Sequence, residues 1–131
     1  MAPTINAIGL AVADMSATLA FYRKLGLDIP AEADNEPHAE ITLPGGTRLM
    51  WDTHELLKSI ESDADPSAGG GGWISLAALC ASPAEVDATY DAMTRAGYHG
   101  HMKPWDAFWG QRYASLHDPD GNGVDLFAPL S

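Results

Sequence analysis

The sequence predicts an α+β fold built from two βαβββ modules that follow one another along the chain. Three observations support this fold class. A length of 131 residues allows one hydrophobic core or at most two. The spacing of apolar residues changes from the period of a strand to that of a helix and back again, twice. Turn and cap residues separate these segments in the same order in each half.

The first module opens with a strand over residues 5–12, because apolar side chains recur there at every second position. Asp14 is the expected N-cap of the following helix, and Gly26 stands where that helix should end. Two further strands, over residues 39–43 and 47–52, surround a Pro-Gly-Gly turn.

The second module repeats this order, beginning with a strand over residues 73–79. The capping box at residues 82–85 has proline at its first helical position and predicts a helix that ends at Gly97. The aromatic-rich segment 104–110 is expected to be a loop. The remaining strands are predicted over residues 98–103, 111–117 and 123–127.

A different kind of segment, residues 54–72, separates module 1 (about residues 4–53) from module 2 (about residues 73–129). Its first part, residues 54–60, could form a short helix. The acidic and then glycine-rich stretch 63–72 is typical of a mobile linker. Because neither module is large enough to bury a good core alone, we expect residues 1–131 to form a single domain.

Composition limits the function classes that this chain can belong to. With 18 acidic and 7 basic residues, the formal charge is −11, so we expect no nucleic-acid partner. The negative field favours a cationic ligand, although an acidic surface also simply promotes solubility. No apolar run is long enough to span a membrane, and the first residues lack the pattern of a secretory signal. Cys80 alone gives no disulfide framework, so we expect a cytoplasmic protein.

Several segments carry a resemblance to a known family. Residues 10–14 (LAVAD) and 21–27 (FYRKLGL) resemble the first βα unit of the vicinal oxygen chelate superfamily, which includes glyoxalases, bleomycin-resistance proteins and extradiol dioxygenases. Residues 110–112 and 118–127 are similar to its C-terminal hairpin. The resemblance implies that the two modules form one curled mixed sheet, a cup with helices on its convex face. It also implies a homodimer, with binding sites between modules or between subunits.

The same resemblance implies where a metal would bind, since each module of metal-dependent members contributes one ligand from its first strand and one from its last. The corresponding positions here are Ala7, Met50, Trp73 and Asp125. A methyl group and an indole cannot coordinate an ion, and a thioether is a poor ligand for hard ions. A catalytic zinc or iron site needs about three protein ligands. We therefore expect no metal and no other cofactor.

The five histidines are expected to be surface or loop residues. His99 and His101 would share one face of a strand. The other three, His38, His54 and His117, are scattered along the chain, and no matching group of carboxylates accompanies them.

Aromatic side chains are the main candidates for ligand contacts. The concave strand face has small residues that leave room, and the candidate walls around it are Trp51, Trp73, Trp105, Phe108 and Trp109. A flat or cationic compound could stack on these rings. For Trp105 and Trp109, a role in sealing a hydrophobic edge or a dimer interface is as consistent with the sequence as a role in lining the cavity.

Asp106 or Asp125 could meet the charge of a cationic ligand, and Asp125 is the one predicted to face the cup. A buried carboxylate needs hydrogen-bond donors or a positive charge, and Arg112 on a neighbouring strand is one possible structural partner. A ligand cation, or an acid–base role for Asp125 in catalysis, is the functional alternative.

These observations favour a metal-free protein of the bleomycin-resistance type, which would sequester an amphipathic or cationic aromatic compound and so give antibiotic resistance. Besides the aromatic residues, the predicted ligand contacts include Ala7, Met50, Arg112 and Asp125. The alternative is an enzyme, either a glyoxalase-like lyase or isomerase or a dioxygenase, acting in the same cup. A third possibility is an interaction module that uses the acidic surface and has no small ligand.

Overall fold

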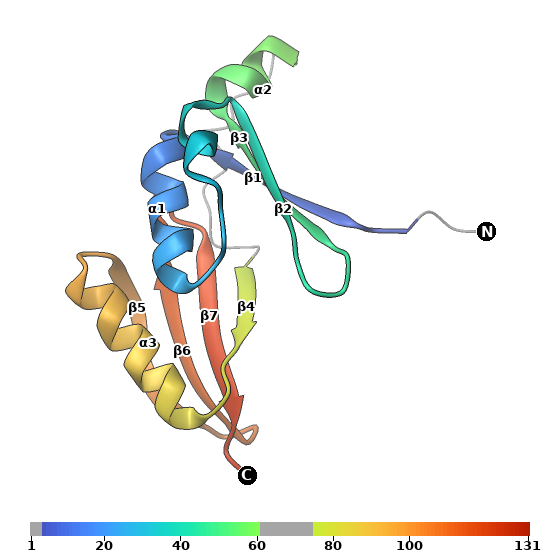
Figure 1. Ribbon diagram of the computed structural model, residues 1–131. Helices are drawn as coiled ribbons and strands as arrows, with labels where there is room; N and C mark the ends of the chain where they lie inside the picture. Colours follow the sequence, from blue (N-terminus) through green and yellow to red (C-terminus); the bar gives the residue numbers. More distant parts are fainter. Residues whose placement is uncertain (1–3, 61–74) are drawn as a thin grey trace. The chain divides into compact units, whose positions relative to one another are not determined.

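The computed structural model of the protein describes residues 4–60 and 75–131. The chain divides into two compact units, Met1–Gly69 and Gly70–Ser131, and the division lies within the predicted linker. Figure 1 shows one helix-bearing sheet in each unit. None of the helices in the described ranges is both long and apolar enough to cross a membrane.

The first unit has a three-stranded mixed sheet in the order β1-β3-β2. Strand β1 pairs with β3 in parallel, and β2 pairs with β3 in antiparallel orientation. Its elements are β1 (Ala7–Val12), α1 (Met15–Leu25), the 3-10 helix η1 (Ala31–Asn35), β2 (His38–Thr42), β3 (Arg48–Thr53) and α2 (His54–Ile60). The short helix expected over residues 54–60 is therefore present.

Local signals explain how α1 begins, ends and packs. The Asp14 side chain accepts a hydrogen bond from the Ala17 amide at 3.2 Å, and the helix ends at the predicted Gly26. Tyr22 is buried and lies 5.4 Å from the ring of Trp51 on β3. The helix therefore covers the sheet face to which the apolar residues of β1 and β3 point.

The second unit has a four-stranded mixed sheet in the order β4-β7-β6-β5. Strands β4 and β7 are parallel, and the other neighbouring strands are antiparallel. The elements are β4 (Ser75–Leu79), α3 (Pro83–Arg95), β5 (His99–Ala107), β6 (Gln111–His117) and β7 (Gly123–Pro129). This order is the full βαβββ module.

The α+β class predicted from the sequence is confirmed, with mixed pairing in both units. The strands are divided between a sheet of three and a sheet of four rather than joined in one sheet. The described part of the first unit has one strand fewer than the expected βαβββ, and η1 occupies part of the segment between α1 and β2.

Helix α3 is set by the predicted capping box. The Ser82 hydroxyl accepts a hydrogen bond from the Glu85 amide at 3.2 Å, and the Glu85 carboxylate accepts one from the Ala81 amide at 3.0 Å. Val86 and Met93 of α3 are fully buried. Figure 1 shows α3 along the sheet formed by β5, β6 and β7. The sheet residues buried on that side include Ala114, Leu116, Val124, Leu126 and Ala128.

Strand β5 extends further than the sequence indicates. Residues 104–110 were expected to be a loop, but β5 continues to Ala107 and only residues 108–110 form the turn into β6. Pro104 is compatible with a strand because β5 is at the edge of the sheet, where one side of the backbone has no strand partner. Gly110 has a φ of 92°, which allows the tight turn.

Candidate functional site

The candidate site lies on the face of the second sheet opposite α3. Since side chains alternate along a strand, Tyr113, Ser115 and His117 of β6 point away from the buried residues Ala114 and Leu116. In the antiparallel register, Ser115 is opposite Asp125 and His117 is opposite Gly123. This open face therefore combines side chains from strands that are distant in the sequence.

Asp125 is held at the centre of the open face by hydroxyl groups. Its carboxylate accepts hydrogen bonds from the Tyr113 hydroxyl at 2.5 Å, the Ser115 hydroxyl at 2.7 Å and the Ser75 hydroxyl at 3.4 Å. Within residues 4–60 and 75–131, no Lys, Arg or His forms an ion pair with it. The carboxylate is thus hydrogen-bonded by neutral donors, and no cation among the described residues neutralises it.

The phenol of Tyr113 is a stable donor to this carboxylate. Burial, and then the hydrogen bond to Asp125 and its negative charge, raise the pKa of Tyr113 to about 12. The hydroxyl therefore stays protonated at neutral pH and fixes the orientation of the carboxylate.

A concavity of about 420 Å³ opens beside Asp125. Ser75 and Ser115 line it together with Asp125, and His101 and His117 line it further along the strands. Gly123 also lies on its wall, where a β-carbon would come within 2.9 Å of the Ser75 side chain. The absence of a side chain at that position lets Ser75 approach the carboxylate.

Aromatic rings adjoin Asp125 through Tyr113. The ring of Trp109 lies 5.3 Å from that of Tyr113 and 5.4 Å from that of Trp105, in edge-to-face arrangements. Phe108 contacts Trp109 at 4.9 Å and has 91% of its surface exposed, while Trp109 is 48% exposed. Together, Trp105, Phe108, Trp109 and Tyr113 form what we call the aromatic cluster. Three of its members were predicted ligand contacts, and Tyr113 was not foreseen.

Arg112 does not pair with Asp125, contrary to the partnership considered from the sequence. Its guanidinium donates to Asp87 of α3 at 2.9 Å and to Asp106 of β5 at 3.0 Å. Arg112 is one residue from Tyr113 along β6 and so projects to the opposite face. Its role in this structure is to link α3 to the edge strand.

The strand registers correct one of the four family metal positions. The two C-terminal strands match through their turns, which makes Met50 the counterpart of Asp125 and Arg48 the counterpart of Gly123. Arg48 is paired with Ala7 in the first unit, and Gly123 with Ser75 in the second. Ser75, two residues beyond Trp73, is therefore the counterpart of Ala7.

The side chains at the four family metal positions do not form a ligand set for a metal ion. In the first unit they offer a methyl group from Ala7 and a thioether from Met50. In the second they offer the hydroxyl of Ser75, which already donates to the single carboxylate, Asp125. Trp73 itself lies outside the described residues.

Trp51, proposed from the sequence as a wall of the ligand site, is a core residue. Its side chain has no exposed surface and packs against Tyr22 of α1. Met50, the next residue along β3, points to the other face, and its terminal methyl lies 3.6 Å from the place where a β-carbon would stand on Gly9. Ala7 is partly exposed on that same face of the first sheet.

Charged residues surround Met50 on this face of the first unit. His38 of β2 contacts Asp52 at 2.5 Å and Glu40 at 2.9 Å, and Arg48 contacts Glu40 at 3.2 Å. The hydrogen bonds to Glu40 and Asp52 raise the pKa of His38 above its ordinary value of 6.5. The network satisfies its own charges within the unit.

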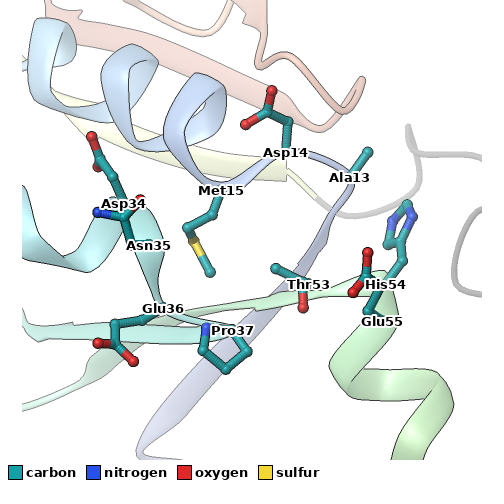
Figure 2. Close-up of a pocket in the computed structure, with 10 residues that line it drawn as sticks. All are labelled: Ala13, Asp14, Met15, Asp34, Asn35, Glu36, Pro37, Thr53, His54 and Glu55. Carbon is teal, nitrogen blue, oxygen red and sulfur yellow. The ribbon is translucent and has the colours of Figure 1, made fainter.

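A second concavity, of about 530 Å³, lies in the first unit. Figure 2 shows its four carboxylates, from Asp14, Asp34, Glu36 and Glu55, spread around Met15 without converging on one point. Two of them already have partners: Asp14 caps α1, and Asp34 forms an ion pair with Arg23 at 2.8 Å. The pocket adds to the negative field but offers no clustered ligand set.

Three histidines, His99, His101 and His117, lie together in the second unit. His99 pairs with His117 across β5 and β6, and the ring of His117 stacks 5.0 Å from His99 and 4.5 Å from His101. The expectation that His117 is an isolated histidine is therefore wrong. The sequence placed His99 and His101 on one face of a strand, but only the pairing of β5 with β6 brings His117 beside them.

Comparison with known proteins agrees with this architecture. A glyoxalase-related enzyme from Fulvimarina pelagi superposes with a TM-score of 0.82 at 20% identity, over 95% of this chain and 87% of that chain. A glyoxalase/bleomycin resistance protein/dioxygenase from Nocardioides superposes with a TM-score of 0.73 at 24% identity, over 100% of this chain and 86% of that chain. A glyoxalase/bleomycin resistance protein/dioxygenase family enzyme from Burkholderia phytofirmans superposes with a TM-score of 0.77 at 17% identity, over 98% of this chain and 100% of that chain. At such identities the likeness shows the fold.

No curated protein matches the chain significantly. The family model described as the Glyoxalase/Bleomycin resistance protein/Dioxygenase superfamily matches residues 4–126, which is nearly the whole sequence. The chain therefore belongs to the glyoxalase/bleomycin resistance protein/dioxygenase superfamily.

Proposed function

We propose that this protein binds a cationic or amphipathic aromatic small molecule on the open face of its second unit, without a metal at the family positions. The observation that carries the proposal is the position of Asp125. Its carboxylate is held by three hydroxyls, lacks an ion pair among the described residues, and connects through Tyr113 to the aromatic cluster. A negative charge beside exposed aromatic rings is suited to a flat cation.

The physical contributions to binding are distinct. The aromatic cluster supplies apolar area and ring faces, of which Phe108 and Trp109 are the most exposed. Asp125 supplies the local charge, and the formal charge of −11 supplies a long-range attraction for cations. The adjoining concavity of about 420 Å³ has the size of a small-molecule site.

The donor chemistry at the family positions separates this proposal from metal-dependent catalysis. Those positions hold a methyl, a thioether, a hydroxyl and one carboxylate, which is fewer than the roughly three strong ligands of a catalytic zinc or iron site. Sequestration of a compound needs no such site. It needs only a shaped, charged surface that excludes water around the ligand.

A pair of isosteric probes tests the proposal: the cation N-methylquinolinium and the neutral 1-methylnaphthalene, titrated against the protein by NMR. We expect the cation to bind more tightly, to shift the indole N–H signals of Trp105 and Trp109, and to weaken as salt rises. Trp109→Ala should weaken both probes by about 1–2 kcal/mol, because stacking area is lost. Asp125→Asn should weaken the cation and leave the neutral probe nearly unchanged.

Asp91→Asn is the matched control, because Asp91 lies on α3 and its removal changes the net charge by the same amount. It should leave the affinity for both probes close to that of the parent. If Asp125→Asn and the parent bind the cation equally well, Asp125 is a structural carboxylate and the proposal fails. Circular dichroism of each variant confirms that the fold is intact.

A further inference from the structure

The three histidines at the edge of the second sheet are arranged like an incomplete ligand set. A nitrogen from each of His99, His101 and His117 lies within 4.8 Å of the corresponding nitrogens of the other two. His99 and His101 are exposed, and His117 is partly exposed. Strand pairing fixes the backbones of His99 and His117, and His101 lies at a register irregularity of β5.

The distances are close to those of a bound ion. Tetrahedral zinc with Zn–N bonds of about 2.0–2.1 Å places its ligand nitrogens roughly 3.4 Å apart, so the rings need to close by about 1–1.5 Å. Side-chain rotation of two exposed histidines covers such a change without moving the strands. Imidazole is a preferred ligand of zinc, copper and nickel.

We infer that His99, His101 and His117 bind one divalent transition-metal ion, of which Zn²⁺ is the representative, at the edge of the second sheet. This site is separate from the family positions, whose only carboxylate is Asp125. Three protein ligands leave a coordination position open, as in catalytic rather than structural zinc sites. His101 and His117 both line the concavity that Asp125 also lines, so the open position faces the same space. This proposal departs from the expectation of no metal that was drawn from the sequence.

The experiment uses the full-length chain without a histidine tag, titrated with Zn²⁺ by isothermal calorimetry. We expect one ion per chain, and a loss of affinity of at least about tenfold in each of His99→Ala, His101→Ala and His117→Ala. His54→Ala is the matched control, because it removes a histidine from α2 in the first unit. The control should bind Zn²⁺ as the parent does. Asp125→Asn tests the family position directly and should lose less affinity for Zn²⁺ than any of the three histidine variants.

Substitution by Co²⁺ gives a second measurement that does not depend on affinity. Visible d–d bands of a four-coordinate ion should appear in the parent and in Asp125→Asn, and vanish in His117→Ala. Added azide should shift these bands, because it can occupy the open position. The inference is overturned if the parent does not bind Zn²⁺ saturably, or if all three histidine variants bind Zn²⁺ as tightly as the parent. Loss of binding in Asp125→Asn with retention in His117→Ala places the metal at the family position and also overturns it.

Discussion

His38 and His117 have environments that shift their pKa values in opposite directions. Hydrogen bonds to Glu40 and Asp52 raise the pKa of His38, while burial and two neighbouring histidines lower the pKa of His117. For His38, the stabilisation from the protonated form is fully present below 6.5, the ordinary histidine value, and is lost as the pH rises through its raised pKa. For His117, stability falls as the pH drops from 6.5 toward its lowered pKa, because the unfolded chain binds the proton more readily.

An NMR titration of the imidazole signals tests this contrast at the scale of single residues. In metal-free buffer, His38 should titrate above 6.5 and His117 below it. Glu40→Gln removes the carboxylate that contributes most to the raised pKa of His38. The pKa of His38 should therefore fall, and that of His117 should not change. Coincident titration of both rings near the ordinary value would contradict the contacts in the two sheets.

Helix α3 begins where its sequence alone predicts, which makes its cap a test at the scale of an element. Ser82→Ala removes the acceptor of the Glu85 amide and should lower the free energy of unfolding by about 1 kcal/mol. Ser82→Asp keeps an acceptor oxygen and adds a favourable charge at the helix N-terminus, so it should preserve stability. Urea denaturation followed by circular dichroism measures both. Equal losses in the two variants would show that the side chain acts other than by capping.

The edge strand β5 shows why propensity alone misplaced an element. The sequence of residues 104–110 predicts a loop, and proline is disfavoured in a central strand because it cannot donate to the ladder. An edge strand lacks that requirement, and β5 accommodates two register irregularities in its pairing with β6. The position of a strand within the sheet, which determines whether proline is tolerated, is a property of the tertiary fold.

For the whole molecule, we propose a homodimer in solution. Side chains of the second unit that are apolar and exposed include Leu79 at 68% and Phe108 at 91%. Sedimentation at micromolar concentration should give twice the chain mass of 13.9 kDa. Because each chain carries a formal charge of −11, added salt should strengthen association by screening repulsion. A single species of 13.9 kDa at all salt concentrations would contradict the dimer and would mean that the ligand site is formed within one chain.

Local chemistry along the chain was enough to determine several features of this protein. Asp14 and Ser82 mark the helix starts through capping hydrogen bonds that span three residues. Alternation of apolar residues identifies the strands and their buried faces, and so places Asp125 on the open face. Ala7 and Met50, at the family positions of the first module, likewise need no structure to show that they are poor ligands for hard metal ions.

The composition of the site was decided by tertiary structure. Tyr113 and Ser115 reach Asp125 only because β6 and β7 pair in a particular register, and a shift of one residue would turn those side chains to the other face. The same dependence on register applies to His117 beside His99. Arg112, which the sequence could equally assign to Asp125, binds Asp87 and Asp106 instead. Strand pairing joins residues that are distant in sequence, and no local propensity encodes which of them meet.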